Sequence, residues 1–200
     1  MRKTLTTALF AASLLTLAAC SDDGGHDGPS ASKITASEEF NQTDVDFATE
    51  MIQHHAQALS MVDLTDGRDL SPELTTLAEQ IRMAQGPEIE TMVDFLNDWN
   101  QPIPETMRDH VNGHGDGQTD VDTDMPGMMS NEQMAELEAA SGPAFEQMFL
   151  TMMIEHHEGA IEMAKTEQED GEYADAITLA EEIEKAQASE ITAMTKFLGS

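Results

Sequence analysis

The sequence has one cysteine, few aromatic residues and very little positive charge. A single cysteine in 200 residues excludes a scaffold of disulfide bonds. Nine basic side chains against 39 acidic ones give a formal charge of −30, which excludes a protein that binds nucleic acid or anionic lipid through a basic surface. Aromatic residues make up only 4% of the chain. The core therefore has to come from aliphatic residues and from the 15 methionines.

The N-terminal segment has the features of an export signal. An apolar run over residues 5–19 follows a short basic stretch and is too short to span a bilayer. It ends in Leu17-Ala18-Ala19-Cys20, which resembles the cleavage box of bacterial lipoproteins. That resemblance implies a signal peptide over residues 1–19 and a lipid on Cys20, and a cleaved secretory peptide with an incidental cysteine is the alternative.

This resemblance also predicts where the protein resides. Residues 20–40 include a stretch rich in glycine, serine and aspartate, which predicts a flexible tether. We therefore expect an exported protein anchored by Cys20 in the cell envelope, on the outer face of the cytoplasmic membrane, in the periplasm or at an outer membrane.

The remainder of the chain contains one internal duplication with an offset of 102 positions. Met51-Ile52-Gln53-His54-His55 aligns with Met153-Ile154-Glu155-His156-His157. The match runs without a gap from Phe47 and Phe149 to Leu96 and Leu198. Each copy has the hydrophobic periodicity of two helices separated by a turn.

The duplication predicts an all-α fold, in which two helical hairpins form a four-helix bundle with a ferritin-like outline. The bundle spans 41–198, with hairpins over 41–99 and 143–198 and a long crossover over 100–142. Thr43 and Ser71 are the predicted N-caps of the first two helices, and Ser130 is the predicted N-cap of a short helix within the crossover.

A helical wheel places both histidines of each copy on the apolar side of their helix. Glu50, Gln53 and Gln57 fall on the opposite, outward arc. The apolar sides also carry Met51, Met61, Met153 and Met163, and on the second helix of each hairpin Gln85, Glu88, Gln187 and Glu190. An unpaired imidazole in such a place costs free energy, so the histidines need partners.

Two interpretations of this buried polar group stay open. A His–Glu–Gln network without metal could fix the helix register of an interaction module. Alternatively, His and Met at spacings of three, four and seven stack on one helix face and form a metal site. Thioether sulfur selects Cu(I), and imidazole accommodates either oxidation state of copper, so copper is favoured over iron or another transition metal.

The two Met-Ile-x-His-His-x-x-Ala-x-x-Met blocks and Met125-Pro126-Gly127-Met128-Met129 resemble a bacterial family catalogued as domain of unknown function 305. The resemblance covers roughly residues 41–198. It implies a ferritin-like fold and an exported or envelope-anchored protein, and some members bind copper and are linked to copper tolerance. It further implies the ligand candidates Met51, His54, His55, Met61, Met153, His156, His157 and Met163. We therefore expect copper buffering, tolerance or delivery.

A ferritin-like di-metal oxidase is the competing function. Di-iron bundles use Glu-x-x-His on two helices and a glutamate on each of the other two. Glu88 and Glu190 fit the second requirement in type, but Met51 and Met153 occupy the positions where the motif needs glutamate. We expect a binding protein rather than an enzyme. The predicted hydrogen-bond partners of the ligands are Glu88, Glu190, Gln85 and Gln187.

The crossover contains a second group of candidate ligands among acidic residues. The group comprises His110, His114, Met125, Met128 and Met129. A solvated acidic linker is the favoured interpretation, and a low-affinity arm that captures copper is the functional one. The expected partners of the protein are thus a metal ion and a membrane, without nucleic acid.

Overall fold

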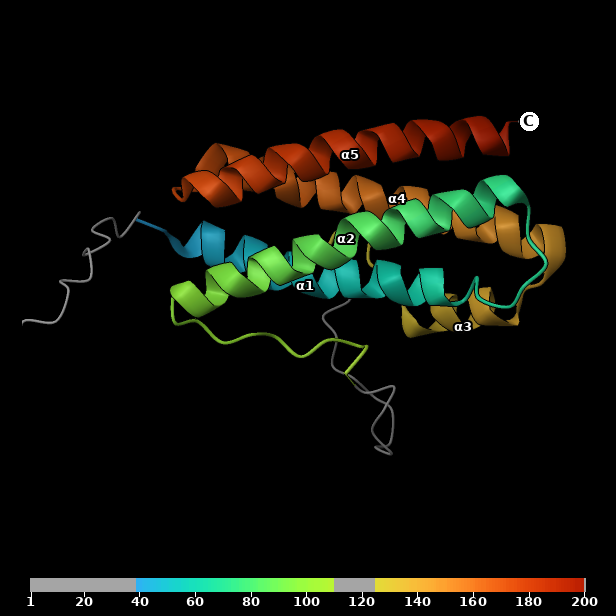
Figure 1. The fold of residues 1–200 in the computed structure, drawn as a ribbon, viewed down its shortest axis with the longest axis horizontal. Coiled ribbons are helices and arrows are strands. Elements are labelled where there is room, and N and C mark those ends of the chain that lie inside the picture. Colours follow the sequence, from blue (N-terminus) through green and yellow to red (C-terminus); the bar gives the residue numbers. More distant parts are fainter. Residues whose placement is uncertain (1–38, 110–124, 200) are drawn as a thin grey trace, which may run out of the picture. The chain divides into compact units, whose positions relative to one another are not determined.

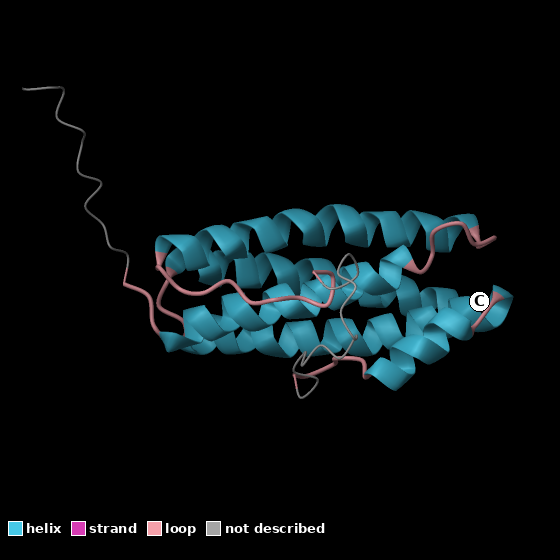
Figure 2. Cartoon of the chain, turned by 90° about the horizontal axis from the view of Figure 1, so that it is seen from below, coloured by secondary structure: helices cyan, strands magenta, loops and turns pink. Residues whose placement is uncertain are grey.

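The computed structural model describes residues 39–109 and 125–199. These residues form four long helices, α1 (Gln42–Asp63), α2 (Pro72–Asp98), α4 (Gly142–Asp170) and α5 (Ala174–Leu198), and one short helix, α3 (Asn131–Ala139). The described part contains no strand (Figure 2), which confirms the all-α prediction. None of these five helices is both long enough and apolar enough to cross a membrane.

Several predictions concern parts of the chain outside the described residues. They are the signal peptide over 1–19, the lipid site at Cys20, nearly all of the tether over 20–40, and the crossover residues His110 and His114.

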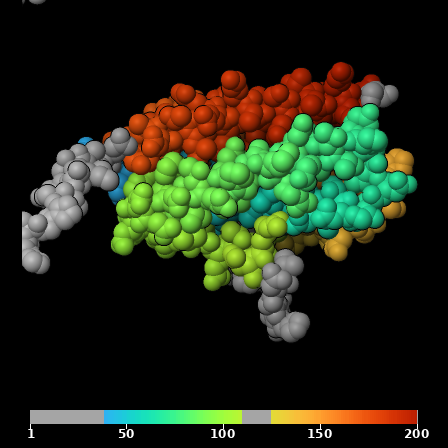
Figure 3. All heavy atoms as spheres, in the orientation of Figure 1, coloured from blue at the N-terminus to red at the C-terminus, as the bar shows by residue number. Residues whose placement is uncertain are grey.

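The four long helices lie side by side as two hairpins (Figure 1). One hairpin is α1 with α2 and the other is α4 with α5, and the hairpins meet where α1 packs against α4 and α2 against α5. α2 and α5 together form one face of the bundle (Figure 3). Adding 102 to the bounds of α2 gives 174–200, which is close to α5 at 174–198. The duplication in sequence is therefore a duplication in structure.

The helices begin at residues that satisfy their free N–H groups. Ser71 accepts a hydrogen bond from the backbone N–H of Leu74, and Ser130 forms a reciprocal capping box with Gln133, as predicted. α1 is capped by Asn41 and not by Thr43, so that prediction is wrong. The Asn41 side chain accepts from two N–H groups of the first turn, and Asp44 accepts from the Asn41 N–H at 2.6 Å. Two reciprocal bonds outweigh the single one available to a threonine cap.

Acidic residues at equivalent positions join the two hairpins. The buried Asp44 of α1 accepts the Tyr173 N–H at 2.8 Å at the start of α5. Glu146 of α4 accepts the Ser71 N–H at 2.7 Å at the start of α2. Each hairpin thus supplies a carboxylate that satisfies free N–H groups in the other. Burial opposes ionisation of Asp44, but the backbone N–H groups of Asn41 and Tyr173 prevail and lower its pKa.

The hydrophobic core is divided into two clusters. One contains Phe47 and Met51 of α1 together with Met163 of α4. The other contains Met61 of α1 together with Phe149 and Met153 of α4. In α1 and α4 the two clusters are separated by the segments that carry the paired histidines. The bundle therefore has a polar layer in the middle of an apolar interior.

Candidate metal centre

The polar layer brings together all four histidines of the two duplicated blocks. His54 and His55 come from α1, and His156 and His157 come from α4. All four are 0% exposed, which confirms the burial predicted from the helical wheel. The rings of His54 and His156 meet at the centre, with centroids 3.7 Å apart and planes tilted by 39°. The duplication thus places equivalent histidines against each other.

The outer histidine of each pair is bonded to a glutamate of the same hairpin. His55 Nε2 lies 2.7 Å from Glu88 Oε2, and His157 Nε2 lies 2.7 Å from Glu190 Oε2. Because a neutral imidazole that donates from Nε2 has its lone pair on Nδ1, each of these rings presents an acceptor nitrogen to the interior. Neither Nδ1 has a hydrogen-bond partner among the described residues. The relation of the two glutamates to a metal remains a prediction.

The inner histidines differ from each other. His54 Nε2 donates to the Pro126 carbonyl oxygen at 3.0 Å, which leaves its Nδ1 without a partner. Within the described parts of the chain, neither ring nitrogen of His156 has a hydrogen-bond partner. Burial, reinforced by the neighbouring histidines, lowers the pKa of His54 to about 3 and that of His156 well below its ordinary value. Both rings are therefore neutral at pH 7, the state in which imidazole binds metal.

Two buried glutamines, each one turn before a glutamate that bonds to a histidine, do not complete a network. Gln85 and Gln187 are 2% and 3% exposed, and neither amide oxygen nor amide nitrogen has a partner within 39–109 and 125–199. A buried unpaired polar group costs about 1–3 kcal/mol, so a structural network would be expected to pair them. The unpaired atoms in this layer fit a site that takes an additional ligand better than they fit a closed network.

Methionine sulfur lies on both sides of the histidine layer. Met51 and Met153 each precede an inner histidine by one turn, which is about 4.5 Å along the helix axis. Met61 and Met163 follow by two turns, and all four methionines are at most 7% exposed. The two clusters pair them as Met51 with Met163 and Met61 with Met153. Each side of the layer thus holds one thioether from each hairpin.

Carboxylates and histidines alone do not form a metal site in the described part of the chain. No group of three or more His, Cys, Asp or Glu side chains there is arranged to hold a metal ion. A carboxylate-rich di-iron centre is therefore not formed among these residues. A metal in the polar layer would need thioether ligands in addition to imidazole, and this donor set fits copper.

The Met125–Met129 segment of the crossover packs against the bundle. Met125, Met128 and Met129 are 7%, 8% and 1% exposed, so the solvated linker favoured by the sequence is wrong for these three residues. Met129 joins the cluster that contains Phe145 and Phe149. This segment contacts α1 at Gln57 and α4 at Gly159, and these contacts bury its apolar side chains.

Gln57 holds this segment in place. The wheel predicted an outward position, but Gln57 is 1% exposed. Its Nε2 donates to the Met129 carbonyl oxygen at 2.7 Å, and its Oε1 accepts the Met129 N–H at 2.7 Å. The outward face of α1 is covered here by the crossover, which a wheel for a single helix does not include.

Two glycines allow the segment to approach α4 closely. A Cβ atom on Gly159 would lie 2.0 Å from the Pro126 carbonyl oxygen, and one on Gly127 would lie 2.5 Å from the Glu155 carbonyl oxygen. Gly127 also has a φ of +73°, which favours glycine. The duplication aligns Gly159 with Gln57, since 159 minus 57 is 102. A glycine inside a helical pattern was the available signal for this contact.

Comparisons with known proteins agree with this fold. The family profile described as domain of unknown function (DUF305) matches residues 44–198. A DUF305 fragment from Deinococcus radiodurans is similar at 29% identity and a TM-score of 0.68, covering 80% of this chain and 97% of that chain. A DUF305 protein from Streptomyces coelicolor, described as a candidate secreted protein, is similar at 30% identity and a TM-score of 0.67, covering 78% of this chain and 92% of that chain.

CopM is a further similar structure. Its Cu(II)-bound form gives 26% identity and a TM-score of 0.62, covering 78% of this chain and 95% of that chain. CopM has also been solved in Cu(I)-bound and Ag-bound forms. No curated protein matches the chain.

Proposed function

We propose a copper-binding function for this chain, which belongs to the DUF305 family. The observation that carries the proposal is the pair of buried, facing imidazoles of His54 and His156, with unpaired ring nitrogens between two layers of methionine sulfur. Imidazole and thioether together are ligands for copper, and the thioether favours Cu(I). The existence of CopM, a relative solved with Cu(I), Cu(II) and silver bound, supports it.

We assign the binding role to the eight residues that the sequence singled out, in unequal measure. His54 and His156 are central, and Met51 and Met153 are the thioethers closest to them along the helices. His55 and His157 would each contribute Nδ1 beside at most one other histidine, because no three of the described histidine side chains are arranged around one metal ion. Glu88 and Glu190 would fix their tautomer and orientation. Met61 and Met163, which follow the inner histidines by two turns, would complete the set of ligands. Gln85 and Gln187 would bond to the ligands.

The cellular role follows from the proposed site and the N-terminal segment. Export and lipidation at Cys20 would place the protein in the cell envelope without a free thiol, where methionine and histidine are the soft and borderline ligands available. We propose copper buffering, tolerance or delivery, by ligand capture rather than turnover. Met125, Met128 and Met129 would cover the site, and His110 and His114 would add a low-affinity arm.

Copper titration with two matched double variants tests this function. We expect the wild type to bind Cu(I) and Ag(I), measured by competition with a chromophoric chelator. His54→Ala/His156→Ala should weaken Cu(I) binding on the order of 100-fold or more, because changes even outside the ligand set cost 10–100-fold. His110→Ala/His114→Ala removes two crossover histidines and should change the affinity less than about threefold.

Each contradictory outcome bears on a different claim. A wild type that binds neither Cu(I) nor Ag(I) would contradict the proposed function. Equal Cu(I) affinity in the wild type and in His54→Ala/His156→Ala would contradict the assignment of the site while leaving metal binding intact.

A further inference from the structure

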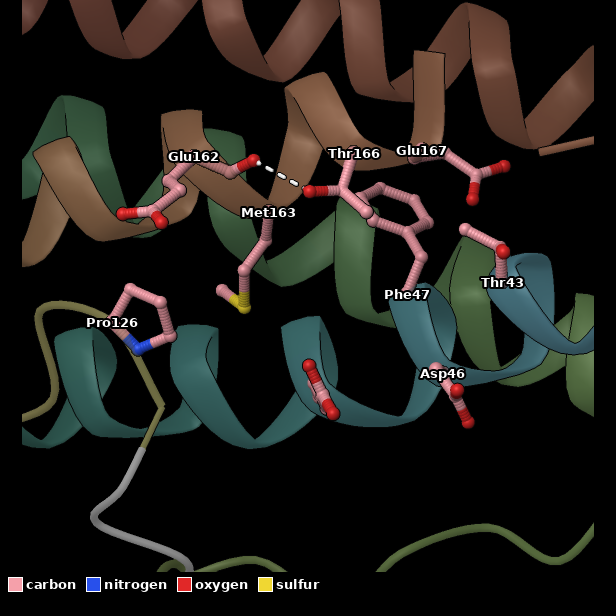
Figure 4. A pocket seen from close by; sticks show the side chains of 9 residues that line it. Thr43, Asp46, Phe47, Pro126, Glu162, Met163, Thr166 and Glu167 are labelled. Carbon is pink, nitrogen blue, oxygen red and sulfur yellow. Dashed lines mark hydrogen bonds between the residues drawn. The ribbon is translucent and has the colours of Figure 1, made fainter. Parts of the chain in front are cut away.

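The groove between α1 and α4 has an open part next to the polar layer. Next to Pro126 this groove forms a cavity of about 290 Å³ (Figure 4). Its walls come from the first turns of α1 and from residues 162–167 of α4. This cavity reaches one of the predicted ligands, Met163.

The walls of the cavity are acidic. Asp46 and Glu50 line it from α1, and Glu162 and Glu167 line it from α4. None of the described residues that line it is basic. A concave site with charge of one sign and low-dielectric walls concentrates counter-ions and raises their association rate. The cavity is therefore suited to attract a cation.

Glu167 distinguishes this cavity from an acidic surface patch. Its side chain is 0% exposed although it lines the cavity, and its carboxyl group lies against that of Asp44. Burial, together with the hydrogen bond to Asp44 and the charge of Asp44, raises the pKa of Glu167 to about 8. Glu167 is therefore largely protonated at pH 7, and a cation that enters the cavity would favour its ionised form.

The inner end of the cavity borders the proposed metal centre. Met163, which is 7% exposed, lines the cavity, and its sulfur points from α4 toward α1 (Figure 4). Pro126 lies at the same end, and its carbonyl oxygen accepts the hydrogen bond from His54. A cation in the cavity would thus meet a thioether first, next to the residue that contacts the inner histidine.

We infer that this cavity is the entrance through which a copper cation reaches His54 and His156. The inference rests on the proposed function and adds a route to it. The carboxylates of Asp46, Glu50 and Glu162 attract the hydrated cation, and the Met163 sulfur is the first soft donor that it meets. Because the acids act before binding is complete, they control the association rate more than the final affinity.

A kinetic comparison of two variants with the same charge change tests the entrance. Asp46→Asn/Glu162→Gln removes two exposed charges from the cavity, and Glu181→Gln/Glu182→Gln removes two exposed charges from α5. Ag(I) binding is followed by stopped-flow fluorescence of Trp99, the single tryptophan. We expect the cavity variant to associate about 3–10-fold more slowly at low salt and the control less than about twofold more slowly.

Salt and affinity measurements complete the test. The difference between the two variants should shrink as the ionic strength rises, because salt screens exposed charges. Equal association rates of the two variants at low salt would overturn the entrance and leave the metal centre standing. A wild type that binds neither Ag(I) nor Cu(I) would overturn the metal centre and the entrance with it.

Discussion

His156→Leu is expected to make the metal-free protein more stable while it removes most of the stabilisation by copper. The His156 ring is fully buried, and neither of its nitrogens has a hydrogen-bond partner among the described residues. Removing two unpaired polar atoms should raise the free energy of unfolding by about 1–3 kcal/mol. Wild type in copper at 1,000 times its Kd should gain about 4 kcal/mol, and the variant should lose most of this gain. Urea denaturation with and without Cu(I) measures both effects.

The gain in the metal-free variant should increase toward acid. The folded-state pKa of His156 lies well below the ordinary 6.5. Below about pH 6.5 this histidine therefore binds a proton in the unfolded wild type but not in the folded protein. Wild-type stability therefore falls as the pH decreases. The leucine variant lacks this site, and its advantage over the wild type should be larger at pH 5 than at pH 7.

His157→Leu is the matched control at the adjacent position. His157 is equally buried, but it bonds to Glu190 at 2.7 Å. Its loss would leave a carboxylate with 18% exposure without this partner, and we expect a destabilisation of about 1–3 kcal/mol. If His156→Leu destabilised the metal-free protein as His157→Leu does, the buried histidines would be a structural network and not a prepared metal centre.

Gly159→Ala is expected to displace the Met125–Met129 segment from α4. The added methyl carbon would lie 2.0 Å from the Pro126 carbonyl oxygen and 2.7 Å from the Gly127 backbone nitrogen. These are backbone atoms, so no rotamer change relieves the clash, and we expect a loss of about 1–3 kcal/mol in unfolding free energy. Hydrogen exchange of the Met128 and Met129 backbone amides should become faster, because the segment loses its close contact with α4.

Gly86→Ala is the control for this substitution. Gly86 also lies inside a long helix, but a Cβ atom there would meet nothing within 4 Å. The second copy has Ala188 at the equivalent position. Alanine is favoured over glycine in a helix by up to about 1 kcal/mol, but Pro87 disfavours a helical residue with a Cβ before it, whereas Ala188 precedes a serine. We therefore expect a change in stability of less than about 1 kcal/mol. Similar stability changes in both variants would show that the approach of the segment to Gly159 does not govern the packing there.

The helical periodicity and the duplication predicted the bundle because both are local or repeated signals. Each histidine pair lies on the apolar side of its own helix, so its burial follows from spacing alone. The two similar blocks belong to one bundle, and the structure places His54 against His156. Glu88 and Glu190 were predicted as hydrogen-bond partners from their place on the apolar side of their helices, and they bond to His55 and His157.

The contacts of the crossover could not be predicted in this way. Gln57 and Gly159 occupy equivalent positions in the two copies. Gln57 forms hydrogen bonds with the Met129 backbone, whereas Gly159 allows the Pro126 backbone to approach α4 closely. A single crossover cannot contact two equivalent sites equally, so it breaks the symmetry of the duplication. It also bonds to His54 and leaves His156 without a hydrogen-bond partner in the described chain. Such contacts depend on the path of a long connection, which has no periodic signal.

X-ray absorption spectroscopy of the Cu(I)-loaded protein at the copper edge tests the central claim most directly. We expect a shell that contains both imidazole nitrogen and thioether sulfur, and a loss of the nitrogen contribution in His54→Ala/His156→Ala. A shell of oxygen and nitrogen without sulfur, or an unchanged shell in the double variant, would contradict a copper centre built from these histidines and methionines.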